Sequence, residues 1–225
     1  MPPKESLKLQ AYNAIKEKII NCEYAPSTLI NEEVLREELN VSRTPIRDAL
    51  SRLEQEGMIS IIPKKGIMVS SLSINDINMI FEVRMLYEPY ALSRYGSLIE
   101  NDTIMKFFND FSIPNGLFTE ETFFEMDDAF HAAIIGAVPN RYLLQTYECI
   151  HNQNLRFRVM TGHVNDKRLE DTSAEHLRIL TACLKQDWEL AAREMEEHLL
   201  ASKNATFDLL LGNATQKSNE NCRIK

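Results

Sequence analysis

The sequence predicts a mostly α-helical protein, with an N-terminal winged helix-turn-helix and a C-terminal all-helical bundle. Within residues 1–70, short amphipathic helices precede two β-rich runs that are joined by a basic turn. From residue 74 onwards the apolar spacing is helical only. We therefore predict a winged helix-turn-helix domain over 1–70, a linker over 71–73, a helical domain over 74–212 and a flexible tail over 213–225.

The composition is compatible with two modest domains that each bury a core, since 44% of the 225 residues are hydrophobic. The net charge of −8 is unevenly distributed. Residues 1–70 hold ten basic and ten acidic residues, whereas residues 71–225 hold fifteen basic against twenty-three acidic. A neutral N-terminal part with a locally basic face favours sequence-specific recognition over non-specific coating of a nucleic acid.

The cysteines and the hydropathy pattern bear on the compartment and on metal motifs. The four cysteines are far apart, so neither a zinc ribbon nor a dithiol motif is supported. No run approaches the roughly 20 apolar residues that cross a bilayer. We expect reduced thiols, a cytoplasmic location and no membrane partner. The cysteines are Cys22, Cys149, Cys183 and Cys222.

Two short helices open the chain. Apolar residues at helical spacing predict a first helix that ends near Tyr24-Ala25-Pro26. Asn31 is a natural N-cap for a second helix, and a tight turn is expected at Asn40. The residues expected to face the common core are Ile15, Ile19, Ile20, Val34, Leu35 and Leu39.

The third helix has the features of a recognition helix. Ser42 is its expected N-cap, Pro45 lies in its first turn, and Gly57 follows its end. Buried positions at i, i+4 and i+7 leave a cationic face that is suited to phosphates and base edges. The buried set is Ile46, Leu50 and Leu53, and the outward set is Arg43, Thr44, Arg47, Ser51 and Arg52.

A hairpin with a basic tip follows this helix and completes the winged module. Its strands are expected over 58–62 and 67–69, and its tip is Pro63-Lys64-Lys65-Gly66. A recognition helix beside such a wing is typical of a DNA-binding domain.

Residues from about Leu9 to Val69 resemble the DNA-binding domain of the GntR family of bacterial transcription regulators. The matching segments are Tyr24-Ala25-Pro26, Leu29-Ile30-Asn31-Glu32, Leu35, 41–50, Leu53, Glu56-Gly57 and 63–66. The resemblance implies that DNA is contacted by Arg43, Thr44, Arg47, Arg52, Lys65 and Gly66. Two departures are visible. Ser27 stands where the family usually has glycine, and Glu33 stands where some members carry a DNA-contacting arginine.

Six helices are expected after the linker, which predicts a bundle. Ser73 is the N-cap of the first, and Thr119 is the N-cap of the third. The first has an apolar stripe of Ile77, Ile80, Phe81, Leu86 and Leu92, and a break falls at Pro114-Asn115-Gly116. The expected spans are 74–97, 102–111, 119–136, 141–161, 173–185 and 187–211.

Three of these helices carry residues that are able to bind a metal. Asp127 and His131 lie four residues apart, so both leave one face of a helix. His176 near the start of the fifth helix and His198 in the sixth add one ligand each. One carboxylate and three imidazoles suit Zn, Ni, Fe or Mn, with positions left for water or an organic acid.

Residues from about Ile74 to Leu211 resemble the FCD effector domain of the FadR subfamily. Its metal-binding members have an Asp-x-x-x-His pair and two later histidines, which Asp127, His131, His176 and His198 match. The resemblance makes Arg84 a candidate for the effector carboxylate, because a guanidinium binds such groups bidentately. The alternative is that Arg84 only pairs with Glu88. His151 and His163 match no ligand position.

The combined prediction is a ligand-responsive transcription regulator, a repressor that binds as a homodimer to an inverted-repeat DNA operator and responds to a small organic acid. One alternative is an architectural dimeric DNA binder without an effector. Another is a helical-bundle metalloenzyme, but di-iron chemistry needs two Glu-x-x-His motifs and the chain has only Glu148-Cys149-Ile150-His151. We therefore predict that the protein is not an enzyme.

Overall fold

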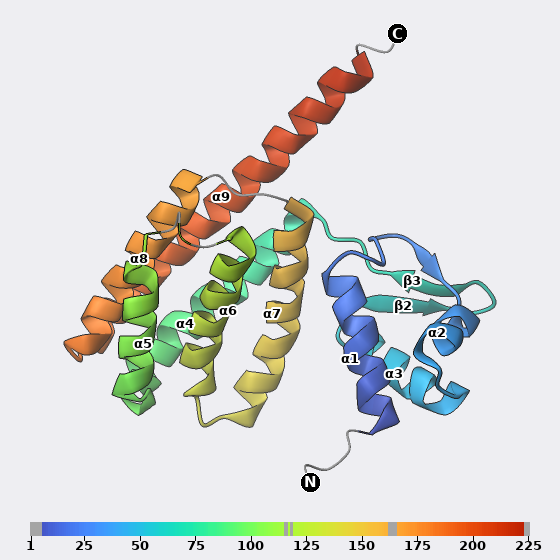
Figure 1. Cartoon of the computed structure of the whole chain (residues 1–225), viewed down its shortest axis with the longest axis horizontal. Coiled ribbons are helices and arrows are strands. Elements are labelled where there is room, and N and C mark those ends of the chain that lie inside the picture. The colour runs from blue at the N-terminus through green and yellow to red at the C-terminus, as the bar shows by residue number, and fades with distance from the viewer. Residues whose placement is uncertain (1–5, 115–116, 118, 162–165, 223–225) are drawn as a thin grey trace. The chain divides into compact units, whose positions relative to one another are not determined.

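The computed structural model describes residues 6–114, 117, 119–161 and 166–222, and it confirms the predicted fold class. A small sheet lies among the first three helices, and the rest of the described chain is helical (Figure 1). Its contacts divide the chain into two units. One contains the segment up to Asp76 together with His151–Met160, and the other contains Ile77–Ile150 and the chain from Thr161.

The N-terminal unit is a helix-turn-helix with a wing. Asn31 caps α2 as predicted, because its side-chain oxygen accepts from the backbone N–H of Glu33 at 2.9 Å. Asn40 ends α2 in the left-handed conformation at φ 51°, which turns the chain towards α3. The elements are α1 (Leu7–Ile20), β1 (Leu29–Ile30), α2 (Glu32–Leu39), α3 (Arg43–Gln55), β2 (Ile59–Ile62) and β3 (Gly66–Val69).

The apolar seam of α3 is buried as predicted, and α1 packs against this helix. Ser42 is the N-cap residue of α3 as predicted, with extended backbone, although its side chain makes no capping hydrogen bond. One detail of the prediction is wrong. Val34 is 44% exposed, because Leu35 and Leu39 occupy the inward face of α2 and Val34 lies beside it.

The wing belongs to a three-stranded antiparallel sheet of order β1-β3-β2. The short strand β1 is not predicted by the sequence, since two residues carry no alternation. Gly66 has φ 124°, and a Cβ there would lie 2.9 Å from the carbonyl oxygen of Ile30. Glycine at this position therefore allows β1 to pair with β3.

The described residues after the linker form the six helices that the sequence predicts and a 3₁₀ turn. These make up the second unit, apart from residues 74–76 and 151–160, which belong to the first. Ser73 and Asp76 cap the first helix reciprocally, and Thr119 caps the third by accepting from Thr122 N–H. The elements are α4 (Ile74–Tyr95), η1 (Gly96–Leu98), α5 (Asn101–Ser112), α6 (Glu120–Gly136), α7 (Arg141–Thr161), α8 (Asp166–Leu184) and α9 (Trp188–Cys222).

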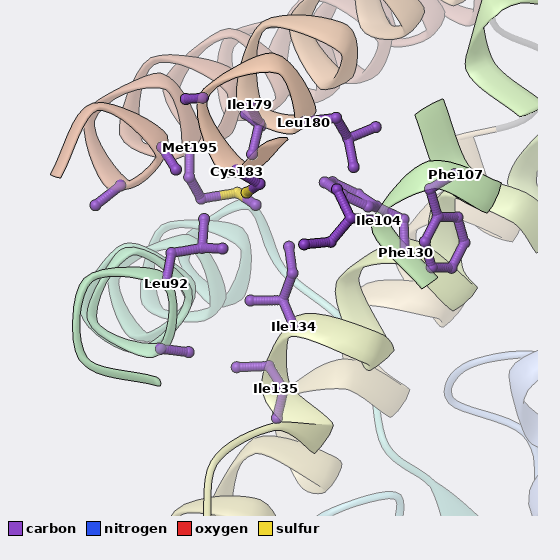
Figure 2. Close-up of a cluster of buried hydrophobic side chains, with 14 of the residues drawn as sticks. Leu92, Ile104, Phe107, Phe130, Ile134, Ile135, Ile179, Leu180, Cys183 and Met195 are labelled. Atoms are coloured by element: carbon purple, nitrogen blue, oxygen red, sulfur yellow. The ribbon is translucent and has the colours of Figure 1, made fainter. Parts of the chain in front are cut away.

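Figure 2 shows the apolar core of this unit, to which α4, α5, α6, α8 and α9 all contribute. Leu92, Ile104, Ile134, Ile179 and Met195 are almost completely buried there. This shared core brings α6, α8 and α9 together, and these are the three helices that carry the predicted metal ligands.

Several predicted details of the bundle differ from the structure. Leu86 is 65% exposed, so it does not belong to the buried stripe of α4. Helix α8 begins earlier than predicted, which places His176 in its interior, and α9 continues to Cys222. Asn115 and Gly116 in the predicted break, and His163, lie outside the described residues. Among the described helices, none is both long and apolar enough to cross a bilayer.

The contact between η1 and the start of α9 gives a stability prediction. A Cβ on Gly96 would overlap Cε3 of Trp188, whose ring packs against the core. We expect Gly96→Ala to destabilise the protein by about 1–3 kcal/mol through overpacking. Thermal and urea unfolding measure this, with Gly136→Ala as the control because nothing lies within 4 Å of its added Cβ. A melting temperature of Gly96→Ala equal to wild type would contradict the expected clash.

Candidate functional site

The first two turns of α3 form an exposed basic face. Arg43, Thr44 and Arg47 are all exposed, while Ile46 and Leu50 anchor the opposite side of the helix in the core. A helix held in this way by its apolar side presents its N-terminal half outwards, which is how recognition helices enter the major groove. The geometry is therefore suited to the DNA contacts that the sequence predicts.

Acidic side chains at the start of α2 lie next to these arginines. Arg47 Nε is 3.2 Å from a carboxylate oxygen of Glu32, and Arg43 is 3.6 Å from Glu33. Glu33 also pairs with Arg36 on its own helix at 2.7 Å. The pairs are solvent-exposed and individually weak, so the arginines remain available to a stronger polyanion.

Arg52 is bound more firmly within the domain. Its guanidinium lies 3.7 Å from the centre of the Tyr12 ring, and its Nε donates to Glu56 at 2.9 Å. The Tyr12 hydroxyl donates to the same carboxylate at 2.8 Å. This cluster fastens α1 to the end of α3, so Arg52 has a structural partner as well as a predicted DNA contact.

At the wing, Lys65 lies in the turn between β2 and β3, and Gly66 is the first residue of β3. Lys65 is exposed, and its backbone N–H donates to the carbonyl of Ile62 at 3.0 Å to close the turn. Gly66 allows β1 to lie close to β3, as described above. The wing tip therefore presents a positive charge at a fixed place on the domain.

In the second unit, the structure brings together all four predicted metal ligands. Asp127 and His131 come from α6, His176 from α8 and His198 from α9, and all four are buried. Their ligand atoms lie within 4.8 Å of one another. Nε2 of His198 is 3.3 Å from Nε2 of both His176 and His131, and Nε2 of His176 is 3.5 Å from Oδ1 of Asp127.

These separations fit a metal ion. Two nitrogens that are each 2.0–2.1 Å from a tetrahedral metal lie about 3.3 Å apart. Burial lowers the pKa of His176 well below its usual range, and burial also lowers the pKa of His198. Both rings are therefore neutral near pH 7 and able to coordinate through nitrogen.

A fully buried carboxylate, Glu88 of α4, lies behind His131. It contacts Nδ1 of His131 at 2.7 Å, Nε of Arg84 at 2.6 Å and the hydroxyl of Tyr147. Burial alone would raise the pKa of Glu88, but the charge of Arg84 and the contacts with His131 hold it well below the usual range. Arg84 is thus paired with Glu88, as the alternative in the sequence interpretation expects, and is only 4% exposed.

A second buried carboxylate lies behind His198. Glu175 of α8 contacts Nδ1 of His198 at 2.7 Å, and Arg168 donates to both of its oxygens at 2.6 and 3.0 Å. Arg168 also donates to Ser202 on α9. Burial opposes ionisation here too, but hydrogen bonds with His198 and Arg168 lower the pKa of Glu175.

Sequence reasoning misses the partners of the histidines. The pattern indicates Glu88 only as a partner of Arg84, and Glu175 only as the residue before His176. The histidines that these carboxylates contact are 43 and 23 residues away in the chain. No spacing rule within one helix connects such pairs, so the tertiary fold alone reveals them.

A winged helix-turn-helix with an exposed basic helix, joined to a bundle with a buried polar centre, defines a class of DNA-binding transcription regulators with a separate ligand-responsive domain. The comparisons with known proteins give the family. The model of bacterial regulatory proteins of the gntR family matches residues 7–69, and the FCD domain model matches residues 79–201. The chain belongs to the GntR family and carries an FCD domain, as the sequence resemblance predicts.

Relatives and solved structures agree with this assignment. The chain is 29% identical over 202 residues to the HTH-type transcriptional regulator YdhC of Bacillus subtilis, and the match covers 87% of both chains. It is 26% identical over 201 residues to the repressor RspR of Escherichia coli, covering 88% of this chain and 87% of that one. The protein is a transcription regulator with a DNA-binding and an effector-binding domain, and its relatives are named as regulators rather than enzymes.

Two solved structures share the fold. E. coli McbR/YncC has a TM-score of 0.77 at 18% identity, with 91% of this chain and 99% of that chain covered. The metal-free FCD domain of TM0439 has a TM-score of 0.55 at 22% identity, and the match covers 64% of this chain and 99% of that chain.

Proposed function

We propose that this regulator is a repressor whose helical domain, residues 74–212, binds a divalent transition metal and a small carboxylate effector. The observation that carries the proposal is the convergence of three histidine nitrogens and one aspartate oxygen at a buried point of the FCD domain. When bound there, a metal such as Zn, Ni, Fe or Mn supplies positive charge and open coordination positions for carboxylate oxygens. The FCD domain of TM0439 is described as metal-free, a distinction that is consistent with metal binding by some FCD domains.

Arg84 is the proposed second contact of the effector. Its guanidinium is buried and linked through Glu88 to His131, so it belongs to the same polar centre. A carboxylate that reaches this centre would share the guanidinium with Glu88, and the arginine would favour a planar, bidentate contact.

For the DNA-binding domain, we propose contacts by Arg43, Thr44, Arg47, Arg52, Lys65 and Gly66 with an inverted-repeat operator. A homodimer would match the two-fold symmetry of such a site. A repressor role is supported by the name of the relative RspR. The cytoplasm is the compartment in which a DNA-binding regulator with reduced thiols would act.

The effector response is tested on an operator selected from a randomised DNA library. Adding mono-, di- and tricarboxylic acids to the metal-loaded protein is expected to weaken operator binding for one of them by about 5-fold to 150-fold, a coupling of about 1–3 kcal/mol. Fluorescence anisotropy of the labelled operator measures the affinity. Asp127→Ala should retain operator binding but lose the response to the acid. Arg84→Lys should weaken the response to the acid.

The control is Glu194→Gln, which alters an exposed ion pair with Arg178 and no residue of the centre. If Asp127→Ala still released the operator as wild type does, the switch would lie elsewhere in the bundle. If no acid acted on any form, the architectural DNA binder of the sequence interpretation would be favoured instead.

A further inference from the structure

The three histidines of the buried centre are held in two different ways. His131 and His198 each have a carboxylate against Nδ1, whereas His176 does not. Within the described part of the chain, Nδ1 of His176 is buried without a hydrogen-bond partner. Its ring instead packs against the rings of Phe111 and Phe130, with centroid separations of 4.5 and 4.6 Å.

A carboxylate against Nδ1 determines which ring nitrogen carries the proton. An ionised carboxylate only accepts hydrogen bonds, so Nδ1–H of His131 donates to Glu88 and Nδ1–H of His198 donates to Glu175. In a neutral ring this leaves Nε2 with a free lone pair. Nε2 of His131 and Nε2 of His198 then face each other at 3.3 Å as two acceptors, an arrangement that a cation between them would stabilise.

Both carboxylates are themselves fixed in place. Glu88 is fully buried and is held by Arg84 and Tyr147, while Glu175 is held by Arg168, which also reaches Ser202 on α9. The rings of His131 and His198 therefore each have a rigid carboxylate partner at Nδ1. Such partners orient a ligating histidine and increase its basicity.

We propose that Glu88 and Glu175 are positioning residues of the metal centre, which hold His131 and His198 through Nδ1 so that Nε2 of each is directed to the metal. His176 has no such carboxylate at Nδ1, and its ring packs against Phe111 and Phe130. This inference rests on the proposed metal binding and assigns to two buried acids a role that their helical spacing does not indicate.

The inference is tested with full-length Glu88→Gln and Glu175→Gln proteins. Competition with a chromophoric chelator is expected to show that each binds Zn²⁺ about 10-fold to 100-fold more weakly than wild type. The absorption bands of Co²⁺-loaded protein should shift, because the ligand rings change orientation and basicity. Glu194→Gln is the matched control, since this α9 carboxylate pairs with Arg178 and contacts no histidine of the cluster.

A purely structural role would give a different pattern. In that case the metal-free variants would melt at lower temperature, and the Co²⁺ spectrum of the folded fraction would be unchanged. Wild-type affinity and spectrum in both folded variants would overturn the inference while leaving metal binding intact. A wild-type protein that binds no Zn²⁺ or Co²⁺ would overturn the inference together with the proposed function.

A measurement on the unaltered protein covers the case in which the variants do not fold. Long-range ¹H–¹⁵N spectra of the metal-free wild type report the tautomer of each histidine. We expect protonated Nδ1 and bare Nε2 for His131 and His198. Protonated Nε2 on both rings would overturn the inference.

Discussion

His198→Ala is expected to abolish the binding of about one metal ion per chain, measured by elemental analysis of the purified protein after reconstitution with Zn, Ni, Fe or Mn. Nε2 of His198 lies 3.3 Å from Nε2 of both other histidines, so this variant removes a ligand group that is close to both remaining imidazoles. Removing it leaves two imidazoles and one carboxylate. We expect an affinity loss on the order of 100-fold or more, larger than the effect of removing a partner of a ligand.

His176→Ala should behave in the same way, and comparing the two variants separates ligation from folding. Ring removal at His176 also leaves a cavity beside Phe111 and Phe130, so this variant should be less stable even without metal. His151→Ala is the control, because His151 is not part of the ligand cluster. Equal metal content in wild type, His176→Ala and His198→Ala would refute the proposed ligand set.

Arg43→Ala and Arg47→Ala are each expected to weaken operator binding by about 10-fold to 100-fold, the range of one lost bidentate base contact. Both side chains are largely exposed at the start of α3, where a recognition helix meets base edges. Fluorescence anisotropy titrations at several salt concentrations separate the two kinds of contact. Loss of a base contact relaxes sequence preference, whereas loss of a phosphate contact reduces the salt dependence.

Glu33→Gln tests the same surface with the opposite expected change in operator affinity. It removes a negative charge that pairs with Arg36 and Arg43, so operator affinity should rise a few-fold. Arg141→Ala, an exposed arginine on α7 of the helical domain, is the control and should bind as wild type does. Unchanged affinity in both Arg43→Ala and Arg47→Ala would place the reading surface elsewhere on the domain.

The winged helix-turn-helix was predictable because its signals are local. Caps, a seam at i, i+4 and i+7 and a basic turn each lie within a few residues of one another, and Asn31, Leu50 and Gly57 behave as their positions indicate. The same local rules fail where a partner is distant. Val34 and Leu86 have apolar side chains, but whether such a residue is buried depends on what packs against it, and both are exposed.

The sequence by itself determined the family, the fold class and the four residues that meet in the helical domain. Family motifs and i, i+4 spacing can be recognised in the sequence without knowing how the helices pack. Only the tertiary structure decided how those residues are supported. Glu88 and Glu175 reach histidines on other helices, Arg84 is engaged by Glu88, and Arg52 is engaged by Tyr12 and Glu56. Contacts between helices depend on the rotation and register with which they pack, and a single sequence specifies neither until the core has formed.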